Sequence, residues 1–100
     1  MKTIFEEKDN KFVMHFEGRL DTSASVQTAK EMEVLYDCEG HDIILDCEGL
    51  EYISSSGLRL FLGLLKAAKP KGSTVTITNL NDDIRQVFDE TGFTSIFNIM

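Results

Sequence analysis

Three consecutive serines are the residues of this chain whose types and spacing could do chemistry. Residues 53–57 read Ile-Ser-Ser-Ser-Gly. The apolar run at 43–45 precedes them, and a leucine-rich segment follows from Leu58 with no proline before Pro70. The three hydroxyls are therefore expected where a strand gives way to a helix. Backbone N–H groups and the positive end of the helix dipole favour an anion there, so the cluster is either an ordinary helix cap or the site of a charge switch.

Little in the sequence could activate these serines as nucleophiles. The two histidines, His15 and His41, fall in an expected strand and an expected loop, and neither has a sequence neighbour that would make a Ser–His pair. The turn lacks the leading glycine of the G-x-S-x-G nucleophile elbow, and Gly57 and Gly63 form no glycine-rich phosphate loop. We therefore expect no enzyme. A hydrolase would need Ser55 and a histidine brought close by folding, of which His41 is the better candidate.

The two cysteines do not indicate a metal site. Cys38 and Cys47 are not in a C-x-x-C pair and lack nearby histidines, whereas a structural zinc site needs about four such ligands. We expect no metal and no cofactor, and two reduced thiols that act as small apolar residues.

Length and charge narrow the class of protein. The chain has 100 residues, so we expect one domain spanning 1–100. Its net charge of -7 argues against binding nucleic acid or an anionic membrane, since both need positive charge. The longest apolar stretch, 58–65, is interrupted by Arg59 and Gly63 and is far shorter than the ~20 residues that span a bilayer. Acids occupy the place of a signal peptide's apolar region, so we expect a cytoplasmic protein without membrane insertion.

The apolar periodicity predicts the elements that would position the serines. A hairpin of strands is expected over 3–7 and 12–16, then a loop at 18–22, where Asp21 or Thr22 caps a helix that stops near Gly40. Further strands are expected at 42–46, 74–78 and 95–99. Helices are expected from 58 to 69 and from Asn81 to about Gly92. The order β-β-α-β-α-β-α-β predicts an α/β domain with a mostly parallel sheet, an N-terminal antiparallel hairpin and helices packed on it.

The leucine-rich helix has an unusually narrow polar stripe. Arg59, Gly63 and Lys66 form it, and nearly every other position is apolar. One interpretation is a helix packed deeply between the sheet and a neighbouring helix. The other is an exposed edge near Gly63 that docks a partner. Both can hold together.

The order of these features resembles the STAS domain, and more narrowly the bacterial anti-sigma factor antagonists. The resemblance rests on the N-terminal hairpin, Gly-Arg-Leu-Asp at 18–21, the apolar strand, and Ser-Ser-Gly-Leu at 55–58 opening a helix. Asn-Leu at 79–80 and Phe-Asp-Glu-Thr-Gly-Phe at 88–93 extend it over nearly the whole chain.

The resemblance implies a protein-binding module controlled by phosphorylation. The unmodified antagonist would bind a serine kinase that is itself an anti-sigma factor, the phosphorylated form would release it, and a serine phosphatase would reset it. The phosphoacceptor falls on Ser55, with Ser54 and Ser56 as alternatives. The resemblance maps partner-binding positions onto Asp21, Ser56 and Gly57. From the leucine-rich helix itself we add Arg59, one turn after Ser55, and Gly63 on its exposed edge.

The family commonly has an aspartate immediately before the acceptor, where this chain has Ser54. The alternative that this departure leaves open is a STAS domain that is never phosphorylated. Such a domain would serve as a scaffold or subunit of a transport or stress-signalling complex.

Overall fold

The sheet begins with an antiparallel hairpin, and every later strand joins it in parallel. The computed structural model describes all 100 residues. Strands β1 (Lys2–Lys8) and β2 (Lys11–Leu20) are joined by Asp9 and Asn10, whose φ angles are 53° and 61°. Two such residues at positive φ suit a tight hairpin turn. Strands β3 (Asp42–Ile53), β4 (Val75–Thr78) and β5 (Asn98–Ile99) follow, and the sheet order is β1-β2-β3-β4-β5.

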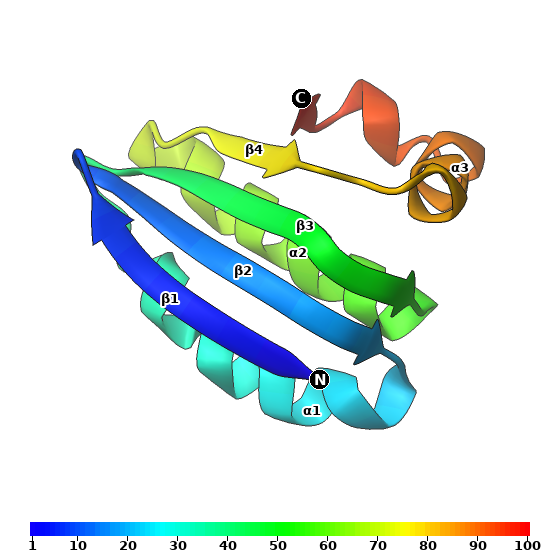
Figure 1. Ribbon diagram of the computed structural model, residues 1–100. Helices are drawn as coiled ribbons and strands as arrows, with labels where there is room; N and C mark the ends of the chain where they lie inside the picture. Colours follow the sequence, from blue (N-terminus) through cyan, green and yellow to red (C-terminus); the bar gives the residue numbers. More distant parts are fainter.

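The helices lie on one side of this sheet. Helix α1 (Thr22–Glu31) connects β2 to β3, α2 (Ser55–Ala68) connects β3 to β4, and α3 (Asp82–Glu90) connects β4 to β5. Right-handed crossovers that all step in the same direction across a sheet place their helices on the same face. Figure 1 shows α1 and α2 behind the sheet, with the opposite face of β1 to β4 uncovered.

The core fills the space between the sheet and the helices. It contains 22 buried apolar residues, and the rings of Phe16 on β2 and Phe61 on α2 lie 5.2 Å apart in it. Helix α2 contributes Leu58, Phe61, Leu64, Leu65 and Ala68. The interpretation of α2 as a deeply packed helix is therefore confirmed.

The predicted fold class and element order are confirmed, but several boundaries were wrong. Residues 18–20 belong to β2 rather than to a loop, and β3 continues seven residues beyond 46, to Ile53. Helix α1 ends at Glu31, and a 3₁₀ helix η1 (Met32–Tyr36) follows. Its buried residues Met32 and Leu35 are three apart, the spacing of a 3₁₀ turn. The last strand is only Asn98–Ile99, because another 3₁₀ turn occupies Phe93–Ser95.

Two bulges in β3 decide where the helices begin. From His15 to Leu20, β2 takes five steps, while β3 takes seven steps over the paired stretch from Asp46 to Ile53. The pairing shifts between His15 and Glu17 and again between Gly18 and Arg19. The two extra residues on β3 bring Ile53 opposite Leu20, so both strands end at the same edge of the sheet.

Both thiols are free and buried, and burial raises the pKa of Cys47 far above its ordinary range. No group of three or more His, Cys, Asp or Glu side chains is placed to hold a metal ion. None of the helices is both long and apolar enough to cross a bilayer.

Candidate functional site: the helix starts at the carboxyl edge of the sheet

Ser54 is the cap of α2. Its backbone is extended, with φ of -87° and ψ of 171°, and its hydroxyl oxygen accepts a hydrogen bond from the Gly57 N–H at 3.2 Å. Only 7% of the residue is exposed. A cap satisfies one of the backbone donors that the first turn of a helix leaves without a partner. The Ser54 hydroxyl therefore has a structural role in stabilising the start of α2.

Ser55 is the first residue of α2 and is exposed. Because Ser54 supplies the cap, the Ser55 hydroxyl is available to another molecule. Ser56 is half-buried in the same turn. Both interpretations of the serine cluster therefore apply, each to a different residue. Ser54 caps the helix, and Ser55 carries an accessible hydroxyl.

Asp21 occupies the equivalent place at the start of α1. Its carboxylate accepts hydrogen bonds from the Ala24 N–H at 2.8 Å and from the Ser23 hydroxyl at 3.1 Å. These bonds, the backbone one first, hold the pKa of Asp21 below its ordinary value, so the carboxylate is ionised at neutral pH. The Ser54 N–H donates to the carbonyl of Leu20 at 2.9 Å. This bond brings the two helix starts side by side.

The remaining predicted partner positions differ in accessibility. Arg59 is exposed on α2. Gly63 is half-buried, and an added Cβ would lie 3.4 Å from the Tyr36 hydroxyl. Gly57 is buried, and its Cβ would lie 2.8 Å from a Leu20 side-chain atom and 2.9 Å from one of Ile53. Gly57 thus lets α2 pack closely on the sheet, and any part it has in partner binding is indirect.

Sequence reasoning missed an exposed pair beside these helix starts. Arg19 and Tyr52 are register partners near the ends of β2 and β3, and the Arg19 guanidinium lies 4.4 Å from the centre of the Tyr52 ring. Tyr52 is 41% exposed. Arginine and tyrosine are enriched among residues that dominate protein interfaces. No local signal reveals this pair, since the two bulges set its register.

Neither histidine can activate Ser55. His41 precedes β3 and stacks on Phe12 with ring centres 4.2 Å apart, while Ser55 follows the other end of that strand. A strand rises about 3.3 Å per residue, so His41 lies tens of ångströms from Ser55. His15 lies mid-sheet, with both ring nitrogens on carboxylates of Glu6 and Asp46. The hydrolase alternative therefore loses its general base.

Comparison with known proteins agrees with this architecture. The family model that describes the STAS domain matches residues 2–100. The chain belongs to the STAS domain family. This STAS domain is 28% identical over 99 residues to BtrV of Bordetella bronchiseptica, for which a role as anti-sigma factor antagonist has been proposed; the match covers 99% of this chain and 85% of BtrV. It is 24% identical over 94 residues to the anti-sigma-B factor antagonist of Bacillus subtilis, covering 94% of this chain and 85% of the relative.

Solved structures show the same fold. The anti-sigma factor antagonist SpoIIAA in its unphosphorylated form superposes with a TM-score of 0.76 at 23% identity, covering 99% of this STAS domain and 87% of SpoIIAA. The phosphorylated form of SpoIIAA from Bacillus gives a TM-score of 0.74 at 22% identity, covering 99% and 91% of the two chains. SpoIIAA has thus been solved in both phosphorylation states on this architecture.

Proposed function

We propose that this STAS domain is an anti-sigma factor antagonist whose binding is controlled by phosphorylation of Ser55. In the unmodified state it binds an anti-sigma factor that is also a serine kinase, and in the phosphorylated state it releases that partner. A serine phosphatase restores the unmodified form. In this proposal the domain acts in the bacterial cytoplasm as a binding protein and not as an enzyme. The names of its relatives support this role.

The observation that carries the proposal is the division between Ser54 and Ser55. A kinase needs an accessible hydroxyl, and Ser55 is exposed, whereas the buried Ser54 hydroxyl serves as the cap. Phosphoryl transfer from ATP to the Ser55 oxygen forms one O–P bond and breaks the bond to ADP. The hydroxyl proton passes to a base on the kinase, because no histidine of this chain lies near Ser55.

The added charge acts on the complex rather than on the fold. A phosphoserine carries about -1.5 to -2 charges, and a helix N-terminus favours such an anion by roughly 0.3–1 kcal/mol. Arg59 is exposed one turn further along α2 and offsets part of the charge. At an interface the phosphate joins the ionised Asp21 on the same edge of the sheet. A partner that accommodates one carboxylate then meets two anions, and like-charge contacts cost several kcal/mol.

The test is incubation with a serine-kinase anti-sigma factor from the same organism and ATP. We expect one phosphoryl group, mapped by mass spectrometry to Ser55 in the wild type and in Ser56→Ala, and none in Ser55→Ala. Ser55→Asp should weaken kinase binding at least tenfold, while the conservative Ser55→Thr should still accept phosphate. Modification of Ser56 in the wild type, or an unmodified protein with an active kinase, would refute Ser55 as the acceptor.

One observation favours a second candidate, a scaffold or subunit that is never phosphorylated. Ser54 stands where the family commonly has aspartate, so the charge beside Ser55 is absent. Affinity purification from the native cell separates the two. A kinase with a phosphatase supports the antagonist, whereas transport or stress-signalling subunits together with an unmodified Ser55 support the scaffold.

A further inference from the structure

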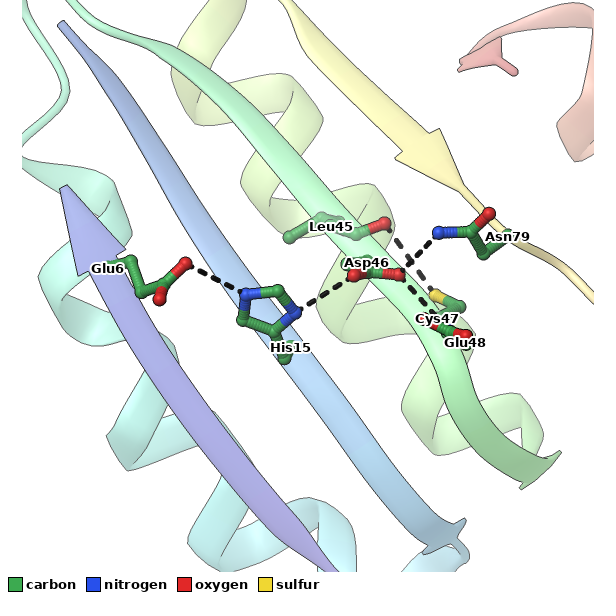
Figure 2. Close-up of polar contacts among 7 residues, drawn as sticks. All are labelled: Glu6, His15, Leu45, Asp46, Cys47, Glu48 and Asn79. Carbon is green, nitrogen blue, oxygen red and sulfur yellow. Dashed lines mark hydrogen bonds and ion pairs between the residues drawn. The ribbon is translucent and has the colours of Figure 1, made fainter. Parts of the chain in front are cut away.

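His15 lies at the centre of a polar network on the uncovered face of the sheet. Its Nδ1 lies 2.8 Å from an Asp46 carboxylate oxygen, and its Nε2 lies 3.1 Å from a Glu6 oxygen. Figure 2 shows the ring between the two carboxylates, on the side of the sheet away from α2. Because Glu6 is on β1, His15 on β2 and Asp46 on β3, the ring connects three strands.

The two contacts require a protonated ring. An ionised carboxylate only accepts hydrogen bonds, and a neutral imidazole has one N–H, whereas an imidazolium has two. The hydrogen bond that the ring donates to Glu6 raises the pKa of His15 most, burial opposes it, and the hydrogen bond and charge of Asp46 raise the pKa further. The geometry and the direction of the pKa agree that the folded protein favours the charged ring.

All charged groups that face His15 are acids. They surround it in a shallow hollow of about 470 Å³ and come from three strands: Glu6 on β1, Glu17 on β2, and Asp46, Glu48 and Glu51 on β3. No cation lines the hollow, and the helices lie behind the sheet (Figure 1). Within the hollow the proton on His15 is therefore the only positive charge, and outside the lining Lys2 on β1 is the register partner of Glu17.

Asp46 connects the ring to the first bulge. One of its oxygens accepts from the Glu48 N–H at 3.1 Å and from the Asn79 side-chain amide at 3.0 Å, while the other faces His15. The β2–β3 register shifts between His15 and Glu17, so Glu48 falls within the irregular stretch. Asp46 thus accepts a hydrogen bond from the backbone at the point where the β2–β3 pairing is interrupted (Figure 2). His15 fixes the orientation of the Asp46 carboxylate.

The bulge lies between this network and the helix starts. Beyond the bulge, β2 ends directly before Asp21, the cap of α1, and β3 ends directly before Ser54, the cap of α2. A change in how Asp46 holds the bulge would alter the relative position of those two caps.

We propose that His15 is a proton-operated positioning residue: its imidazolium fixes Asp46 and the β3 bulge, and loss of the proton loosens the pairing beyond the bulge, which shifts Ser54 relative to Asp21. The idea that this movement regulates partner binding rests on the proposed function. The coupling within the domain does not depend on it.

The direction with pH follows from the raised pKa. Both hydrogen bonds of the ring are present below the ordinary histidine pKa of 6.5. One of them is lost as pH rises through the higher folded-state pKa, because the neutral ring keeps a single N–H. Against the opposing effect of burial, the hydrogen bonds from Asn79 and the Glu48 N–H hold the pKa of Asp46 below its ordinary value. Asp46 therefore stays ionised over that range, and His15 changes charge beside it.

The test is an NMR titration of the uniformly labelled full chain, without any partner. We expect the His15 ring to titrate above 6.5, and the amides of Glu48, Gly49 and Ser54 to shift with the same midpoint. Glu6→Gln should lower the ring midpoint and move the amide midpoints with it, a result that a merely structural role for His15 would not give. His41→Asn is the matched control and should leave the co-titration unchanged.

Three results would overturn the proposal. The first is a His15 midpoint at or below 6.5, and the second is a set of amides that do not follow the ring. The third is a Glu6→Gln variant in which the ring midpoint moves and the Ser54 amide midpoint stays. Each of these leaves the phosphorylation of Ser55 untouched, so failure here is distinguishable from failure of the proposed function.

Discussion

Replacing Ser54 with alanine should destabilise the domain, whereas the same change at Ser55 should not. Ser54→Ala removes the acceptor of the Gly57 N–H, which is buried. Loss of a serine cap costs about 0.5–2 kcal/mol, and the buried donor left without a partner places the expected loss in the upper half of that range. Ser55 is exposed and outside the cap, so Ser55→Ala should change stability by less than ~0.5 kcal/mol.

A third variant, Ser54→Asp, separates capping from other effects. Aspartate caps a helix as well as serine does, and a carboxylate at the N-terminus adds roughly 0.3–1 kcal/mol from the dipole. Ser54→Asp should therefore match or exceed the wild type in stability. It also places an acid beside Ser55, so the same protein tests whether a charge there affects the proposed phosphorylation of Ser55.

Thermal and urea unfolding, followed by circular dichroism, measure these differences. For a domain of this size, 1 kcal/mol corresponds to about 4–8 °C in Tm. The assignment of roles within the serine cluster would be refuted if Ser55→Ala lowered Tm as much as Ser54→Ala. It would equally be refuted if Ser54→Asp failed to recover the loss.

Three further expectations concern the surroundings of this site. Gly57→Ala should destabilise the domain by about 1–3 kcal/mol in urea unfolding, because the added Cβ would collide with Leu20 and Ile53; an unchanged midpoint would contradict the close packing. The stability difference between wild type and His15→Asn should be largest below pH 6.5 and shrink as pH rises through the raised pKa of His15; a difference that grew with pH would contradict the ion-pair assignment. Tyr52→Ala should weaken kinase binding at least tenfold in calorimetry with little change in Tm, since the ring is 41% exposed; unaltered affinity would remove this residue from the partner surface.

The starts of α1 and α3 were the parts of the fold that the sequence predicted best, whereas α2 begins at Ser55, three residues before the expected start at Leu58. Asp21 caps α1 and Asn81 caps α3 through local hydrogen bonds to residues three positions later, and such bonds depend only on neighbouring residues. The serine cluster was located for the same reason. Which of its hydroxyls forms the cap could not be predicted, because three adjacent serines offer the same chemistry and only the backbone angles distinguish them.

The second half of β3 could not be predicted, because its periodicity is not that of a strand. Ile43, Leu45 and Cys47 are buried at every second position, but the next buried residues are Leu50 and Ile53, at every third. Each bulge adds a residue and so displaces the pattern. The contact of Arg19 with Tyr52 depends on this register and was missed for the same reason.

The parallel pairing of β2 with β3 also has a consequence for how fast the domain folds. Lys11 pairs with Asp42 and Ile43 with Val75, so each pairing closes a loop of about 30 residues, whereas the β1–β2 hairpin closes through two. Mixed α/β domains with such separations fold more slowly than helical bundles. The entropy cost of closing each loop arises before the stabilising contacts between the strands have formed. The hairpin can form early, but its inner face is buried only when the helices pack on it. Substitutions in the β2–β3 ladder should therefore slow folding more than they speed unfolding, and substitutions in β5 should do the reverse.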